Sequence, residues 1–193
     1  IHLGCWAHAR RYFVEAEAVL PKAVRRPDQL GTQFIAAIAR LYAVEAKVKG
    51  KGVAERAQLR EAASRSILAE IQQLLVTHRH SVTPGSLLGK ALHYLEAQWP
   101  KLIRYVENGA WPIDNNLCEN AIRPFVVGRR NWLFADTVAG ANGSANIYSL
   151  IVTCRANGVD TYRYLVALFK ALPLAKTADD YEQLLPWHLT LGD

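Results

Sequence analysis

The residues with the strongest claim to chemistry lie together between positions 114 and 124. The segment reads Asp-Asn-Asn-Leu-Cys-Glu-Asn-Ala-Ile-Arg-Pro. Glu119 stands four residues before Arg123, so on a helix the two side chains share one face. Carboxylate oxygens are ligands that Mg²⁺ prefers, which makes Glu119 a candidate metal ligand. Two structural readings stay open: Asn116 and Glu119 have the spacing of a helix capping box, and Glu119 and Arg123 that of an ion pair.

A basic and aromatic stretch follows directly. Arg129, Arg130 and Asn131 precede Trp132, and the sequence from 120 to 135 contains no acid. Guanidinium groups match phosphate oxygens, and an aromatic ring can stack on a nucleic-acid base. A carboxylate beside such a patch suits a metal ion held between an acid and a phosphate. The alternative readings are a solvated turn for the two arginines and a core position for Trp132.

The composition favours a soluble globular protein with a polyanionic partner. The chain has 193 residues, 51% of them hydrophobic and 21% charged, and a formal net charge of +6. Three widely spaced cysteines indicate free thiols in a reducing cytoplasm, which is the expected location. Neither an apolar run of about 18 residues nor a signal peptide is present, so a membrane is not expected as a partner. The chain starts at Ile1 and has no Met, which indicates either a piece of a longer protein or a chain whose start was processed off.

Apolar residues recur at helical spacing through most of the first half of the chain. The start, Ile1–Trp6, is instead a short apolar run that predicts a buried strand. Residues 8–108 are expected to be almost wholly helical. The expected helices span about 8–20, 31–48, 54–77, 85–98 and 101–107.

The second half of the chain has a different sequence pattern. The cluster at 114–116 predicts the start of a helix, and Pro124 is expected to end it. Short apolar runs at 125–127 and 131–135 predict a small hairpin, and the Gly- and Asn-rich segment 139–144 predicts a loop. The last expected helices span about 144–156, 160–171 and 178–185.

Five motifs resemble the C-terminal part of the IS66-family insertion-sequence transposases, which belong to the DDE group. The first is Gly4-Cys5-Trp6-Ala7-His8-Ala9-Arg10-Arg11, followed by Asp114-Asn115-Asn116-x-x-Glu119-x-x-Ile122-Arg123-Pro124 and Gly128-Arg129-Arg130-Asn131-Trp132-Leu133-Phe134. The last two are Tyr148-Ser149-Leu150-Ile151-x-Thr153 and Asn157-Gly158-Val159-Asp160-x-Tyr162-x-Tyr164-Leu165. Five motifs in the family's order and spacing are far more specific than any one of them.

The resemblance implies a mainly α chain with few short strands, forming the C-terminal part of an RNase H-like α/β catalytic domain with a large helical insertion. In such enzymes two Asp and one Glu hold two divalent metals, Mg²⁺ or Mn²⁺, and these promote phosphodiester transfer on DNA. Glu119 matches the third acid and is the expected catalytic residue and metal ligand. The positions expected to contact DNA or organise the site are Arg10, Arg11, Arg123, Arg129, Arg130 and Asn131.

The same resemblance divides the chain into four parts. Residues 1–20 end the RNase H-like core as a strand plus a helix, and 21–110 form the helical insertion. Residues 111–171 hold the Glu-bearing helix, the hairpin and the helices that follow. The remaining residues, 172–193, form a C-terminal tail.

The two aspartates that the family requires are not found before Glu119. Asp28 lies in a polar loop with proline and Asp114 lies in the cap cluster, so neither ends an apolar strand. Both family aspartates, and with them metal binding, are therefore expected upstream of Ile1, and this piece alone is expected to be inactive. Asn120 stands where the family usually has Arg, which removes a cation from the edge of the site.

Three hypotheses of function follow. The first is a fragment of a transposase that acts on double-stranded DNA, at transposon ends and target, and that self-associates as the resemblance implies. The second is a non-catalytic DNA-binding remnant or a regulator of transposition. The third is a helical scaffold, which salt-insensitive or absent DNA binding would favour.

Overall fold

The computed structural model describes residues 1–21, 26–131 and 135–189. In these residues every regular element is a helix and no strand is present, which confirms the mainly α expectation but not the short strands. The described chain forms two compact units, Ile1–Leu117 and Cys118–Asp193.

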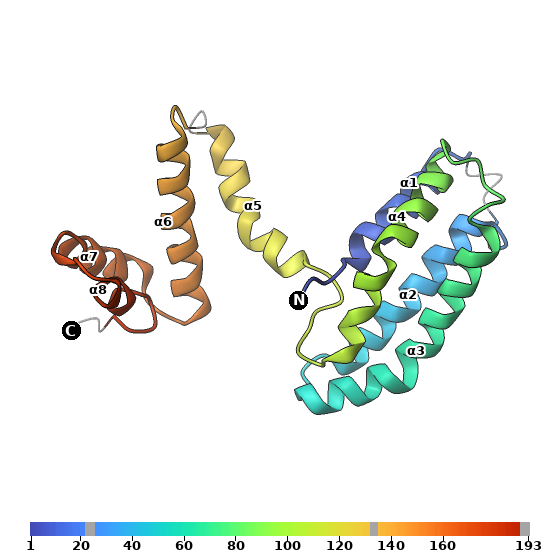
Figure 1. Cartoon of the computed structure of the whole chain (residues 1–193), viewed down its shortest axis with the longest axis horizontal. Helices are drawn as coiled ribbons and strands as arrows, with labels where there is room; N and C mark the ends of the chain where they lie inside the picture. The colour runs from blue at the N-terminus through green and yellow to red at the C-terminus, as the bar shows by residue number, and fades with distance from the viewer. Residues whose placement is uncertain (22–25, 132–134, 190–193) are drawn as a thin grey trace. The chain divides into compact units, whose positions relative to one another are not determined.

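The first unit is a bundle of four helices (Figure 1). They are α1 (Trp6–Ala18), α2 (Leu30–Val48), α3 (Val53–His78) and α4 (Leu87–Leu102), and the 3-10 helix η2 (Ile103–Glu107) follows α4 directly. Within the bundle α1 packs against both α2 and α4, and α2 packs against α3. The expected helices of this half are therefore confirmed, with ends shifted by at most four residues, and the last of them is the 3-10 helix η2.

Large apolar side chains at helical spacing form the core of the bundle. Trp6 and Phe13 on α1 are fully buried, and the Phe13 ring stacks on Phe34 of α2 with centroids 4.5 Å apart. The indole Nε1 of Trp6 donates to the carbonyl oxygen of Leu102 at 2.9 Å, so the one polar atom of this ring is satisfied inside the core. Burying a side chain of this size stabilises the fold by roughly 1.5–3 kcal/mol.

The prediction of a strand at Ile1–Trp6 is wrong. The chain is irregular up to Cys5, and α1 already begins at Trp6. The Gly4 amide donates to the Lys101 carbonyl at 2.9 Å and the Trp6 amide to the Ile113 carbonyl at 3.2 Å. Two partners from separate segments satisfy this backbone in place of the continuous ladder that a strand needs.

The second unit contains α5 (Asn116–Asn131), which starts in the last residues of the first unit, and α6 (Val138–Ala156). Then come α7 (Thr161–Ala171), the 3-10 helix η3 (Leu172–Leu174) and α8 (Ala178–Gln183). Its small core joins α6, α7 and the segment after α8 through the buried residues Cys154, Tyr164, Leu168 and Leu184.

Two predictions for the middle of the chain are wrong. Helix α5 runs through Pro124 to Asn131, although an interior proline gives up one backbone hydrogen bond, so 125–131 is not half of a hairpin. Residues 132–134, which include Trp132, lie outside the described residues. The expected loop at 139–144 is also helical, because the Thr137 hydroxyl accepts from the Gly140 amide at 3.0 Å and caps α6 at its start.

Candidate functional site

Helix α5 carries five of the predicted site residues. Glu119 lies in its first turn, Arg123 in its middle, and Arg129, Arg130 and Asn131 at its end. Because a helix turns by about 100° per residue, Glu119, Arg123 and Arg130 fall within about 40° of one another around its axis. The acid and two of the arginines therefore share one face of a single helix, where the sequence predicted a helix followed by a hairpin.

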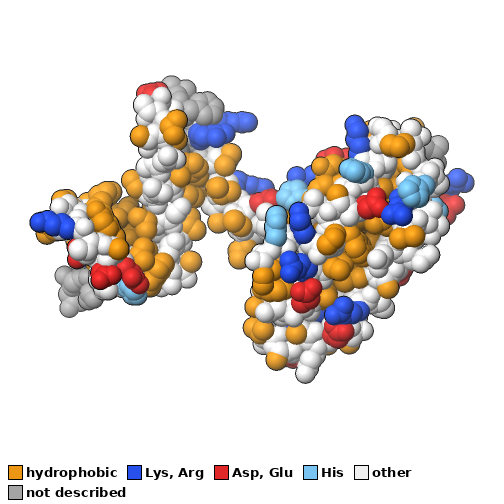
Figure 2. Space-filling model, in the orientation of Figure 1, with side chains coloured by type: hydrophobic (Ala, Val, Ile, Leu, Met, Phe, Trp, Pro, Cys, Tyr) orange, Lys and Arg blue, Asp and Glu red, His pale blue; other side chains and the backbone are white. Residues whose placement is uncertain are grey.

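A different face of α5 packs against α6. The Tyr148 hydroxyl of α6 donates to the carbonyl oxygen of Ala121 at 2.8 Å, and its ring lies 5.0 Å from that of Phe125. None of the described residues of α5 is fully buried, and the three arginines are exposed. Figure 2 shows blue side chains at the carboxyl end of this helix.

The charges on α5 also suit the helix itself. A carboxylate in the first turn, such as Glu119, and cations in the last turn, such as Arg129 and Arg130, lower the energy of the helix dipole. Each such interaction is worth roughly 0.3–1 kcal/mol on an exposed helix. The charge order therefore stabilises α5 and also separates an acidic end from a basic end.

Asp114 holds the start of α5. Its Oδ1 accepts from the Asn116 amide at 3.1 Å, and its Oδ2 accepts from the Asn116 side-chain amide at 3.0 Å and from the Tyr42 hydroxyl at 2.8 Å. Burial first, and then the hydrogen bond to Asp114, raise the pKa of Tyr42 far above its ordinary value, so the phenol stays protonated as the donor. Asn116 is the first residue of the helix, so it is not the N-cap that the capping-box reading requires.

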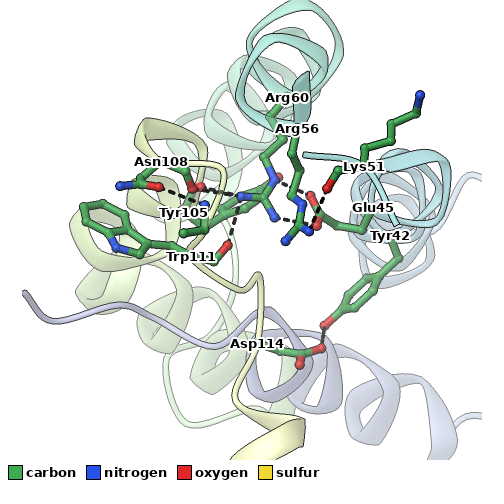
Figure 3. Close-up of polar contacts among 10 residues, drawn as sticks. Tyr42, Glu45, Lys51, Arg56, Arg60, Tyr105, Asn108, Trp111 and Asp114 are labelled. Carbon is green, nitrogen blue, oxygen red and sulfur yellow. Dashed lines mark hydrogen bonds and ion pairs between the residues drawn. The ribbon is translucent and has the colours of Figure 1, made fainter. Parts of the chain in front are cut away.

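The turn that leads to Asp114 is held by a buried arginine (Figure 3). Arg60 of α3 is 1% exposed, and its Nε and Nη2 donate to the two carboxylate oxygens of Glu45 at 2.8 and 2.7 Å. Its Nη1 donates to the carbonyl oxygens of Tyr105, Asn108 and Trp111 at 3.0, 3.1 and 2.9 Å. One guanidinium thus ties α2, α3 and the turn after η2 together.

The close approach of this turn to α3 also depends on a glycine. A Cβ placed on Gly109 would lie 1.9 Å from the carbonyl oxygen of Val53 at the start of α3. No side chain can occupy that space, so residue 109 must be glycine for the turn to reach Arg60. The bundle therefore fixes the path of the chain up to the first residues of α5.

Sequence reasoning missed Arg60, although a signal was present. Arg60 precedes Ile67 by seven residues and Ile71 by eleven, which places it on the same helical face as these two buried residues. An arginine in register with an apolar face indicates a buried cation with dedicated partners.

The structure separates the two arginines predicted on α1. Arg10 lines a hollow with Ala7, Ala39, Tyr42 and Asn116, so it lies near the residues where α5 begins. Its positive charge favours the ionised phenol of Tyr42, against the larger effect of burial. Arg11 is exposed and, one residue on, points about 100° away around the helix.

The described residues do not supply a complete metal site. No group of three or more His, Cys, Asp or Glu side chains that could hold a metal ion occurs among them. Glu119 offers one carboxylate, whereas two divalent ions need several oxygen ligands.

Two further observations concern the thiols and the helix lengths. Cys5, Cys118 and Cys154 are free cysteines, and they are half-buried, exposed and buried, respectively. Among the described residues, no helix has both the length and the apolar character that crossing a bilayer requires.

Comparison with known proteins places the chain in a family. The transposase IS66 family matches residues 1–143, and the IS66 C-terminal element matches residues 149–187, from the middle of α6 to the segment after α8. The uncharacterized protein y4qI of Sinorhizobium fredii is 33% identical over 185 residues, which cover 96% of this chain. The uncharacterized protein y4hP of the same organism is 30% identical over 194 residues, which cover 95% of it.

The chain spans about a third of the length of these relatives, 33% of y4qI and 34% of y4hP. No solved structure matches it. One family accounts for the motifs at the start of the chain, for the segment around Glu119 and, through its C-terminal element, for α7 and α8. The chain belongs to the IS66 transposase family.

Proposed function

We propose that this chain is the C-terminal part of a transposase that cuts and joins DNA by phosphodiester transfer. Family membership itself suggests a function related to transposition. In the proposal, Glu119 is the third acid of a D-D-E triad, and the two aspartates belong to an RNase H-like core N-terminal to the segment matched here. Relatives about three times as long leave room for such a core.

The observation that carries the proposal is the shared face of Glu119, Arg123 and Arg130 on α5. A carboxylate binds a phosphodiester only through a cation, whereas guanidinium groups bind phosphate oxygens directly. A DNA strand that lies along this face could contact a cation bound to Glu119 with one phosphate and the arginines with the next phosphates. Mg²⁺ or Mn²⁺, held by Glu119 and the two aspartates, is part of the proposal for the intact protein.

Glu119→Gln in the intact protein tests the proposed role. Glutamine has nearly the same shape but no charge, so we expect strand transfer to be lost while folding and DNA binding persist. Glu61→Gln is the matched control, since Glu61 is an exposed acid of α3 that pairs with Arg65. Strand transfer by Glu119→Gln at the level of the control would refute the assignment.

The second candidate is a non-catalytic DNA-binding remnant or regulator of transposition. The observation that favours it is the exposure of Arg123, Arg129 and Arg130 on α5, because guanidinium groups bind phosphate oxygens without a metal. This chain should then bind double-stranded DNA and compete with the intact enzyme without cutting. Binding that weakens steeply with salt would support phosphate contacts, and loss of one contact by Arg123→Gln should reduce the salt slope by about one unit.

Self-association is a further part of the proposal. Sedimentation of the chain with and without transposon-end DNA would test whether copies associate, and whether they do so only on DNA.

Asn120→Arg, which restores the family's usual residue, should tighten DNA binding because it returns a cation next to Glu119.

A further inference from the structure

A second hollow on the bundle, with other lining residues than the hollow at Arg10, lies between α1 and α4. Its volume is about 630 Å³. The side chains that line it come from α1, from α4 and from the turn before α4: Tyr12, Pro84, Lys90, His93, Tyr94 and Ala97. Its lining combines aromatic rings with cationic or protonatable side chains. Packing of the bundle core does not require this combination.

Two tyrosines form the aromatic part. The rings of Tyr12 and Tyr94 stack with centroids 4.5 Å apart and planes inclined by 28°. Tyr12 is 39% exposed and Tyr94 is half-buried, so part of this stacked pair is open to solvent. A tyrosine phenol is uncharged at neutral pH, and burial raises the pKa of Tyr94 further, so this ring does not repel an anion.

The polar part carries the positive charge of Lys90 and the imidazole of His93, a hydrogen-bonding group. Lys90 and His93 are exposed and lie one turn apart on α4, and no acidic residue is among the described side chains that line the hollow. The carboxylate of Glu96, also on α4, is engaged by Arg79. Figure 2 shows blue and pale-blue side chains beside orange ones on this unit. An anion with an aromatic component is the ligand that such a surface fits.

We propose that this hollow binds single-stranded nucleic acid, with a base stacked on the Tyr12–Tyr94 pair and the adjoining phosphates held by Lys90 and His93. Every base has a face that stacks on an aromatic side chain, and a basic groove follows the backbone. In a duplex these faces are covered by neighbouring base pairs, so an unpaired strand is the form that fits. The proposal does not depend on Glu119 or on the missing aspartates.

The test uses the full chain and a fluorescently labelled oligothymidine of about 12 nucleotides, within the usual site size for such proteins. Tyr12→Ala should weaken binding by about 5- to 150-fold, the range expected when one stacking ring is removed. Tyr12→Phe keeps the ring and should bind within about two-fold of the unaltered chain. Tyr162→Ala is the matched control, because Tyr162 is a 77% exposed tyrosine of α7 outside the hollow.

Charge variants form the second arm. Lys90→Gln removes an exposed cation without altering the core. It should weaken binding of the strand and lower the salt dependence of that binding. If Tyr12→Ala fails to fold, Lys90→Gln still tests whether the hollow binds the strand. Glu15, by helical spacing one turn beyond Tyr12 on α1, is exposed, and Glu15→Gln should strengthen binding.

Several results would overturn the proposal. Tyr12→Ala or Lys90→Gln that is folded and binds the strand as well as the unaltered chain would show that the hollow is not the site. A duplex of the same length that displaces the strand equally well would reduce the interaction to general phosphate attraction. An acidic peptide that competes as well as the strand would assign the hollow to a protein partner.

Discussion

Replacing Arg60 with leucine removes a buried polar link between the helical bundle and the turn that leads into α5. The guanidinium is 1% exposed and donates to the Glu45 carboxylate and to the carbonyl oxygens of Tyr105, Asn108 and Trp111. Leucine fills part of the volume but donates nothing. The carboxylate and the three carbonyls then lose their partner where water has little access.

The structure sets the size of the effect. Removing one partner of a buried ion pair costs about 3–5 kcal/mol, and the lower part of that range applies here, because Glu45 keeps 17% side-chain exposure and regains some hydration. Carbonyls left unsatisfied add about 1 kcal/mol each. We expect Arg60→Leu to lower the free energy of unfolding by about 3–6 kcal/mol, a large share of the stability of an ordinary domain.

Urea denaturation followed by circular dichroism measures this loss. The matched control is Arg65→Leu, because Arg65 lies on the same helix with 56% side-chain exposure and pairs with Glu61 four residues away. An exposed pair of this kind is worth about 0.3–0.5 kcal/mol. Both variants replace an arginine of the same helix with leucine. The difference between their losses in stability therefore reports the effect of burial and of the hydrogen-bond partners.

A loss below about 1 kcal/mol for Arg60→Leu, or one equal to that of Arg65→Leu, would refute the reasoning. The double variant Arg60→Leu with Glu45→Leu gives an independent check. Without an unpaired carboxylate, it should be more stable than the sum of the two single losses implies. Strict additivity would mean that the two side chains do not act as a pair.

Two further predictions concern tyrosines. Burial raises the pKa of Tyr105 from 10.0 to about 12, so its contribution to stability is full below pH 10 and is lost as the pH rises to about 12. Over that window the free energy of unfolding should fall by about 2–3 kcal/mol more in the unaltered chain than in Tyr105→Phe, and parallel pH profiles would contradict this. Tyr42→Phe removes the donor to Asp114 and should cost about 1 kcal/mol. Amide hydrogen exchange at Asn116 should then quicken, and unchanged exchange would mean that Tyr42 does not hold this turn.

The helices of the bundle could be predicted because their apolar residues repeat at the helical period. Trp6, Ala9, Phe13 and Ala16 follow that period in the sequence, and all four are buried in α1. The strand at Ile1–Trp6 was a wrong prediction, because a short apolar run does not show whether a neighbouring strand exists to pair with it. In the structure Gly4 and Trp6 bond to Lys101 and Ile113 instead.

Helix α5 shows where local signals mislead. Pro124 ordinarily ends a helix, and Val126 and Val127 favour strands, so the sequence predicted a break and a hairpin. The structure keeps one helix, with Phe125 against the ring of Tyr148. This contact joins residues more than twenty positions apart, and no local pattern contains it.

The assignments to Glu119 and the arginines of α5 came from residue types and family resemblance, and they stay predictions. What the sequence did not reveal is how their helix is held. The turn before α5 depends on Arg60, Glu45 and Tyr42, which lie 54, 69 and 72 residues before Asp114 in the sequence. Such long-range polar contacts produce no repeating pattern in the sequence. The one local signal is that Arg60 lies on the same helical face as the buried Ile67.

The unequal exposure of the three cysteines offers a practical route to α5. Cys118, exposed and adjacent to Glu119, is open to a thiol reagent, whereas Cys154 is fully buried and its pKa is raised by burial. Thiolate formation and access control such reactions, so a brief maleimide treatment should label Cys118 well before Cys154. Replacing the half-buried Cys5 with serine then leaves one reactive position. A fluorophore there would follow the acidic end of α5 as nucleic acid or another chain approaches.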